Sequence, residues 1–254
     1  MSNDDTRDNK KKEYEYSIAN DYMKANKYKE AKDIFTALGT YEDSKEMAFE
    51  AEKGEKYSAA IKSLQNKNYL DAQKAFCDLD EYKDSDEYEK LSNSYILLDN
   101  ADKLYDKDWK EAIKIYDKVL EIYGGLGETF NCEAKAIELR YELAVKLVSA
   151  GRYGTAKKYL EELTDYKGSD ALLESVNEYM AKYESALVDY ENGDYEKVLE
   201  DLEGLGNYKK TSSMRKEAQK KVDYANNESA SNEGGSEEVF DIFGAIEKYN
   251  NNGY

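Results

Sequence analysis

The chain has 254 residues, with 55 acidic and 37 basic side chains, a net charge of −18 and no histidine. The acidic excess disfavours direct binding to a nucleic-acid backbone, and without histidine the chain lacks imidazole metal ligands and the usual general base near neutral pH. We therefore expect a protein that is not an enzyme, with no catalytic, cofactor or metal site.

The first 13 residues are charged and polar, which predicts a polar N-terminal extension. They contain no apolar core of the kind that a secretory signal requires, and no run of 18 apolar residues occurs in the sequence. We therefore expect a cytoplasmic protein that does not insert into membranes.

Between residues 14 and 225 the sequence repeats one pattern with a period of about 41 residues. In each copy an aromatic residue, here called the anchor, follows a short polar turn, and successive anchors are 41, 40, 44 and 42 residues apart. A small residue or valine stands three positions after the anchor, and a large apolar residue stands seven positions after it. These offsets follow one face of an α-helix. The five anchors are Tyr28, Tyr69, Trp109, Tyr153 and Tyr195.

A second, longer helix is expected before each anchor. Four copies have a tyrosine twelve residues before the anchor, and a turn with asparagine or glycine separates the two helices. These tyrosines are Tyr16, Tyr57, Tyr141 and Tyr183. We predict one long and one short helix per copy, packed antiparallel, with a long helix over roughly residues 44–66.

After the short helix the first two copies continue with Tyr-x-Asp-Ser. Asp43 and Asp84 stand three residues before Glu46 and Glu87, which is the spacing of a capping box. We expect the aspartate side chains to accept hydrogen bonds from free amides at the start of the next helix.

The third copy departs from this pattern. It lacks Tyr-x-Asp-Ser and has glycine at positions 124, 125 and 127, which predicts a longer and more mobile loop over residues 121–130. This loop has neither the Lys-Ser/Thr nor the strand that a phosphate-binding loop needs. Cys77 follows Phe76 in an apolar helical stripe and is expected to be buried, and we expect no disulfide with Cys132.

The pattern resembles the tetratricopeptide repeat family and related helical-hairpin solenoids over roughly residues 14–225. The first copy carries the resemblance with Ala19, Tyr22, Tyr28, Ala31, Phe35 and Leu38. The resemblance implies an all-α fold, a right-handed α-solenoid of about five antiparallel helix-hairpin repeats. The chain lacks the proline that usually ends the second helix of the family, and its period exceeds the usual 34 by about seven residues, nearly two helical turns.

The C-terminal part differs in composition from the copies. Residues 226–236 are small and polar and predict a flexible linker, and residues 237–254 predict a short amphipathic helix with a tail. Its apolar residues include Val239, Phe240, Ile242, Phe243 and Ile246. Three interpretations stay open: the helix caps the array, it binds a groove on a partner, or the segment is disordered.

The resemblance favours a non-catalytic scaffold or adaptor whose concave face binds a protein or peptide. Candidate contacts besides the five apolar tail residues are Tyr22, Asn26, Tyr105 and Tyr190, each of which could instead pack between repeats. The acidic surface favours a partner with basic character. The alternative is an acidic inhibitor that blocks a nucleic-acid-binding protein by charge mimicry. The sequence leaves the partner and the oligomeric state open.

Overall fold

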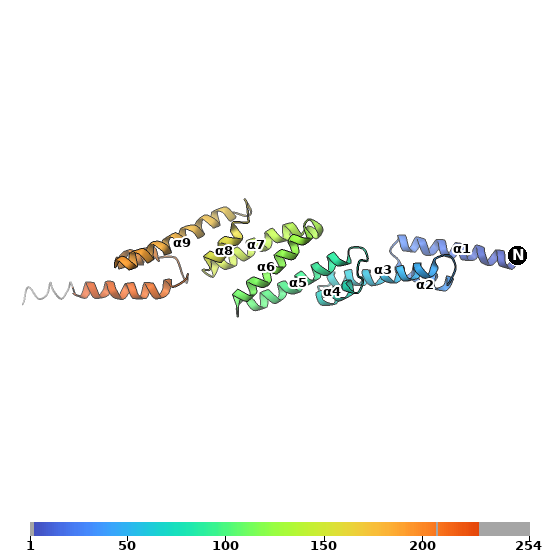
Figure 1. Cartoon of the computed structure of the whole chain (residues 1–254), viewed down its shortest axis with the longest axis horizontal. Coiled ribbons are helices and arrows are strands. Elements are labelled where there is room, and N and C mark those ends of the chain that lie inside the picture. Colours follow the sequence, from blue (N-terminus) through green and yellow to red (C-terminus); the bar gives the residue numbers. More distant parts are fainter. Residues whose placement is uncertain (1–2, 207, 229–254) are drawn as a thin grey trace, which may run out of the picture. The chain divides into compact units, whose positions relative to one another are not determined.

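The computed structural model describes residues 3–206 and 208–228, and within these ranges the chain is helical, with no strand (Figure 1). The chain divides into two compact units, Met1–Ala136 and Ile137–Tyr254. Helices that follow one another in sequence pack together: contacts join α1 through α6 successively in the first unit, and α8 to α9 and α9 to α10 in the second. Among the described residues, none of the helices has the length and apolar character needed to cross a membrane.

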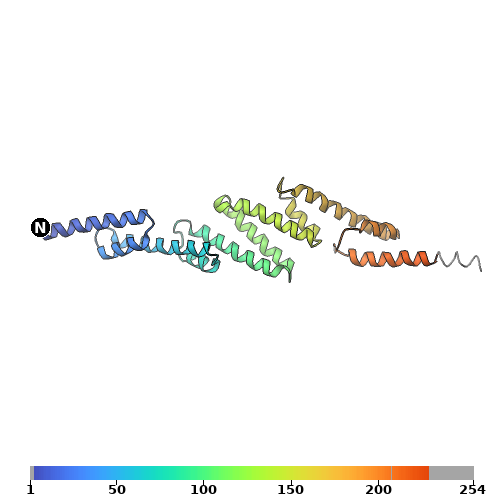
Figure 2. The same ribbon diagram turned by 180° about the vertical axis from the view of Figure 1, so that it is seen from behind.

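The first unit contains three helical hairpins, whose succession Figure 2 shows from the side opposite to Figure 1. Its helices are α1 (Asn3–Lys24), α2 (Tyr28–Leu38), α3 (Ser44–Gln65), α4 (Tyr69–Cys77), α5 (Ser85–Tyr105) and α6 (Trp109–Leu126), followed by the 3-10 turn η1 (Thr129–Asn131) and the start of α7 (Cys132–Ser149). Because α1 begins at Asn3, residues 3–13 of the expected N-terminal extension form the first part of this long helix.

The second unit continues the alternation of long and short helices. It contains the rest of α7, then α8 (Tyr153–Leu160), α9 (Ser169–Asn192), α10 (Tyr195–Asp201) and a further helix over residues 211–228 that is unlabelled in Figure 1. In both units each described short helix that follows a polar turn begins at a predicted anchor, and α3 matches the predicted span closely.

The turn between the long and the short helix is a Schellman turn in four of the copies. In the first, the Lys27 amide donates to the Tyr22 carbonyl at 2.9 Å, across a left-handed Asn26 with φ 56°. The other left-handed residues at this position are Lys67, Gly151 and Gly193. The third copy differs, because its Asp108 amide donates to the Leu104 carbonyl and the Asp108 carboxylate accepts from the Glu111 amide at 3.1 Å.

The expected capping role of Asp43 and Asp84 is wrong. Both residues precede a helix, yet neither side chain bonds a helix amide. Instead the Tyr16 hydroxyl donates to Asp43 Oδ1 at 2.5 Å, and the Tyr57 hydroxyl donates to Asp84 Oδ1. The carboxylates therefore join each turn to the long helix that lies 27 residues earlier.

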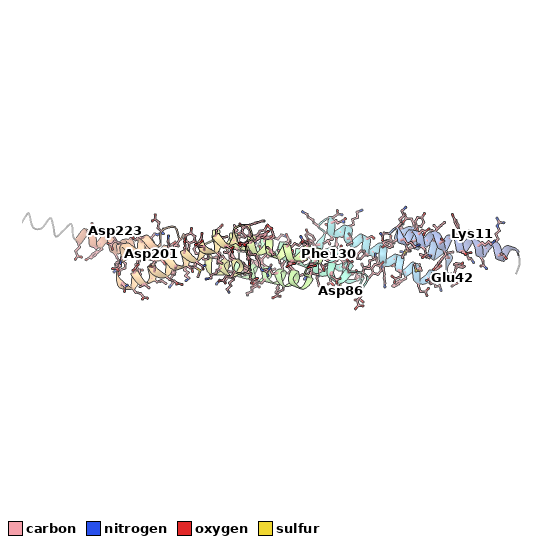
Figure 3. All side chains as sticks on the ribbon, turned by 90° about the horizontal axis from the view of Figure 1, so that it is seen from above. Lys11, Glu42, Asp86, Phe130, Asp201 and Asp223 are labelled. Carbon is pink, nitrogen blue, oxygen red and sulfur yellow. The ribbon has the colours of Figure 1, made fainter. Side chains whose placement is uncertain are left out.

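The prediction of a loop over residues 121–130 is also wrong for the first part of that range. α6 continues to Leu126 and includes Gly124 and Gly125, and the left-handed Gly127, whose φ is 56°, caps its C-terminal end. The buried side chains of Val119, Leu120 and Tyr123 hold these additional turns in the core. Phe130 then packs on Tyr88, with ring centroids 4.3 Å apart, and its place in the first unit is labelled in Figure 3.

The predicted apolar stripe forms the core of each hairpin. Ala31, Phe35 and Leu38 are buried in the first copy, and the corresponding residues of the second copy are buried as well. Cys77 is exposed, contrary to expectation, because its position beside Phe76 lies off this stripe, whereas Cys132 is buried.

The anchor ring joins neighbouring copies. A Cβ atom at Gly54 of α3 would lie 2.4 Å from Cδ1 of the Tyr28 ring, which starts α2 in the preceding copy. Glycine inside this long helix is therefore required by the close approach of a tyrosine ring. A Cβ atom at Gly124 in α6 would meet no heavy atom within 4 Å.

Two glycine-to-alanine substitutions should have opposite effects on stability. Gly54→Ala should lower the free energy of unfolding by about 1–2 kcal/mol, because the collision with the Tyr28 ring outweighs the better helix propensity of alanine. Gly124→Ala should raise it by about 0.5–1 kcal/mol. Urea denaturation of both variants tests this, and a Gly54→Ala protein at least as stable as Gly124→Ala would contradict the ring packing.

Candidate functional site

Four copies hold a pair of tyrosine rings at the turn after the short helix. One ring comes from the long helix and the other from the turn, and the two pack edge to face. The pairs, with their centroid distances, are Tyr16–Tyr41 at 6.0 Å, Tyr57–Tyr82 at 5.9 Å, Tyr141–Tyr166 at 5.6 Å and Tyr183–Tyr208 at 5.1 Å. This repeated geometry makes the tyrosine pairs comparable between copies.

In three copies a lysine lies over the tyrosine pair. The lysine follows the turn tyrosine and has a positive φ, which is 56° for Lys83, 48° for Lys167 and 46° for Lys209. Lys83 Nζ lies 4.8 Å and 5.3 Å from the ring centroids of its pair, and Lys209 Nζ lies 4.8 Å and 5.0 Å from those of its own. These distances are typical of cation–π contacts.

Lys83 also joins the second copy to the first. Its ammonium group donates to the Tyr28 hydroxyl at 2.8 Å and lies 5.1 Å from the centroid of that ring. Burial lowers the pKa of Lys83, but the hydrogen bond to Tyr28 and the charges of nearby residues outweigh this effect and leave the pKa raised. The group therefore stays protonated at the seam between copies.

In the fourth copy an acidic side chain of α7 supports the turn lysine. Gly168 replaces the aspartate of the first two copies, so the Tyr141 hydroxyl donates to the carbonyl of Lys167 at 3.1 Å. The Lys167 ammonium bonds Glu138 Oε1 at 2.6 Å, and the Tyr166 hydroxyl donates to the same carboxylate. The hydrogen bonds to Lys167 and to Tyr166 lower the pKa of Glu138.

The first tyrosine pair has glutamate where the others have lysine. Glu42 adopts the same left-handed conformation, with φ 48°, and is exposed, and its place after α2 is labelled in Figure 3. Within residues 3–206 and 208–228, no lysine or arginine lies over the Tyr16 or Tyr41 ring. The hydrogen bond to Asp43, together with burial, raises the pKa of Tyr16. Two ring faces beside two carboxylates can accept an ammonium group from another molecule.

A second feature is a set of exposed apolar side chains on the long helices of the second unit. Val145 of α7 is 39% exposed, and Leu187 and Val188 of α9 are 36% and 57% exposed. Val145 and Leu187 stand eight residues before their respective anchors, so they occupy equivalent positions in two successive long helices. The first unit also exposes Phe49 and Leu70.

The structure places two of the sequence-derived candidates together at the first turn. Tyr22 is half-buried against the core of the first hairpin, and Asn26 is the left-handed turn residue, whose side-chain oxygen accepts from the Tyr28 hydroxyl at 2.5 Å. Both therefore take part in the packing and the turn of the first copy.

The other two candidates lie in different hairpins. Tyr105 is buried at the end of α5. In the second unit Tyr190 packs edge to face on Tyr195 at 5.7 Å, and its hydrogen bond to Glu217 raises its pKa. The tail candidates Val239, Phe240, Ile242, Phe243 and Ile246 lie outside the described residues, as do residues 229–236 of the expected linker; residues 226–228 are helical.

The sequence reasoning missed the exposed residues Val145, Leu187 and Val188. Val145 and Leu187 directly follow the buried residues Ala144 and Ala186, and Val188 extends the apolar run by one position, so the sequence shows an apolar stripe that is wider than the core requires. Periodicity alone does not tell which edge of a wide stripe is covered. In the described part of the chain, no group of three or more histidine, cysteine or acidic side chains is arranged to hold a metal ion.

Compared with known proteins, the chain matches no family model, no curated protein and no solved structure.

Replacing Glu42 with lysine should stabilise the protein. The new ammonium group should lie over the Tyr16–Tyr41 pair, as Lys83 does over its own pair, and raise the free energy of unfolding by about 0.5–1 kcal/mol. Denaturation of Glu42→Lys beside Glu121→Lys measures this, because Glu121 is exposed in the C-terminal half of α6 and its substitution changes the net charge equally. Equal effects of the two substitutions would show that the tyrosine pair does not bind the cation.

Stability should fall above about pH 10, where tyrosines of the unfolded chain ionise. Burial raises the pKa of Tyr123 to about 12, and burial and a hydrogen bond to Asp102 raise that of Tyr116. A tyrosine whose pKa is higher in the folded than in the unfolded chain stabilises the fold at pH values below the unfolded-state pKa. This contribution is lost as the pH rises through the folded-state pKa. In Tyr123→Phe, the decrease in the free energy of unfolding between pH 9 and pH 12 should be smaller than in the wild type by about 2 kcal/mol. Urea denaturation across this range tests it, and an unchanged slope in the variant would contradict it.

Proposed function

We propose that the chain is a non-catalytic scaffold or adaptor that binds a protein or an extended peptide. In this proposal it forms a right-handed α-solenoid of about five tetratricopeptide-like repeats in the cytoplasm, and the partner lies along the long helices on the concave face. The observation that carries the proposal is the exposed apolar set Val145, Leu187 and Val188, because apolar side chains at equivalent positions of successive helices form a repeated contact surface.

The charge around this set indicates the chemistry of the partner. Glu142 of α7 and Glu184 and Glu191 of α9 are exposed on the same helices, and the whole chain has a net charge of −18. A partner with apolar side chains flanked by basic ones would therefore complement this surface, and the charges would accelerate its association at low salt.

The proposal is tested by capturing partners from the native host with the full chain and with a Leu187→Ser/Val188→Ser variant. For a captured and identified protein, the variant should bind about tenfold more weakly, which corresponds to about 1.4 kcal/mol of lost apolar contact. Asn177→Ser is the matched control, since Asn177 is exposed elsewhere on α9. It should bind like the wild type.

Two outcomes would count against the proposal. Equal binding by the double variant and the control would exclude the apolar set as the contact. A complex that dissociates steeply with added salt and is displaced by DNA or RNA would instead indicate an acidic inhibitor that mimics nucleic-acid charge.

A further inference from the structure

The helix over residues 211–228 begins like the long helix of another copy. Thr211 is buried and its hydroxyl donates to the Tyr208 carbonyl at 2.5 Å, as Ser85 donates to the Tyr82 carbonyl at the start of α5. Met214 and Ala218 continue a buried face along this helix. The helix thus follows the fifth copy as α5 follows the second.

Tyr224 lies on this helix in an exposed position that its counterparts do not share. It stands 41 residues after Tyr183, yet it is 68% exposed whereas Tyr183 is 4% exposed. In the first two copies the equivalent tyrosine packs edge to face on a phenylalanine of the short helix, Tyr16 on Phe35 at 5.6 Å and Tyr57 on Phe76 at 5.8 Å. Tyr224 is therefore the tyrosine of a long helix whose short helix is not among the described residues.

The sequence after residue 228 supplies a short helix in the same register. Residues 239–251, VFDIFGAIEKYNN, align without a gap with residues 31–43, AKDIFTALGTYED, and five positions are identical. Val239, Phe243, Ile246 and Tyr249 stand 41 residues after Val198, Leu202, Leu205 and Tyr208. The apolar tail residues thus repeat the buried stripe of the fifth copy.

The intervening length also matches. Tyr224 and Val239 are 15 residues apart, as are Tyr16 and Ala31, and in each of the copies that have this tyrosine the spacing is the same. Gly234 stands ten residues after Tyr224, the offset at which Gly193 follows Tyr183 and takes its left-handed conformation with φ 84°. This chain length allows the same antiparallel return within one molecule.

We propose that residues 236–249 bind the exposed face of the helix over residues 211–228 in the same chain and complete a sixth hairpin. Phe243 packs on the Tyr224 ring, as Phe35 packs on Tyr16, and the turn forms at Gly234. The anchor position is Ser236, so this copy lacks an aromatic anchor of the kind with which Tyr28, Tyr69 and Tyr153 contact the following long helix.

This inference is independent of the proposed function and changes the role of the tail candidates. Val239, Phe243 and Ile246 occupy the buried stripe of the sixth copy. Phe240 occupies the position of Lys32 and Lys157, which face outward enough to be half-exposed. The tail is then part of the array and is not a recognition helix for a partner.

Amide hydrogen exchange of the full chain tests the proposal with two matched variants. In the wild type, residues 237–246 and the helix over residues 211–228 should both exchange at least tenfold more slowly than an unstructured peptide. Phe243→Asp should abolish the protection of the tail and reduce that of the helix. Phe240→Asp introduces the same charge three residues away and should leave both protected.

Three outcomes would overturn it. The tail would not bind the helix if residues 237–246 exchanged like an unstructured peptide in the wild type. The register would be wrong if Phe240→Asp and Phe243→Asp had equal effects. Protection that disappeared on dilution would show that the tail binds a second copy of the chain, which contradicts binding within one molecule.

Discussion

The contact on which the architecture depends is that between the anchor ring of one copy and the long helix of the next. Tyr28 lies on Gly54, Tyr69 stacks on Tyr95 with centroids 4.8 Å apart, and in the second unit Tyr153 stacks on Tyr179 at 5.2 Å. A single hairpin buries too little apolar surface to offset the cost of ordering its backbone. Within each unit, neighbouring copies therefore stabilise one another, as expected for helical repeats.

The turns show how a chain without proline fixes the ends of its helices. Left-handed residues such as Asn26 and Lys83 reverse the chain direction, and the buried hydroxyls of Ser85 and Thr211 donate to carbonyls of the turns that precede their helices. In the turn after the short helix, the left-handed residue is in three copies the lysine that lies over the tyrosine pair. One local conformation thus serves both chain reversal and ring–cation packing, and the first pair has a glutamate, Glu42, at the position of the lysine.

The positions of the hairpins could be predicted because their signals are local and periodic. The anchors begin the short helices, and Ala31, Phe35 and Leu38 form the core as expected. The role of Asp43 could not be predicted in the same way. Its carboxylate accepts a hydrogen bond from the Tyr16 hydroxyl, 27 residues earlier, and not from a nearby amide, and local sequence does not show such a contact. Likewise, the glycines of α6 are helical because buried neighbours such as Tyr123 outweigh weak local propensity.

The candidate site was harder to derive from sequence than the fold. Tyrosines at helix ends suggest contacts with a partner, yet Tyr105 is buried and Tyr22 packs on the core. The exposed Val145 and Leu187 could not be recognised from sequence because each directly follows a buried alanine, Ala144 or Ala186. Which edge of a stripe remains uncovered depends on the packing of the neighbouring helices, and no periodicity encodes that.

The most direct test of the account is a double-mutant cycle between Tyr69 and Tyr95, measured by urea denaturation of the wild type, Tyr69→Leu, Tyr95→Leu and the double variant. The stack between the anchor and the next long helix predicts a coupling energy of about 0.5–1.5 kcal/mol. Additive effects, with no coupling between the two substitutions, would contradict the claim that anchor rings hold neighbouring copies together.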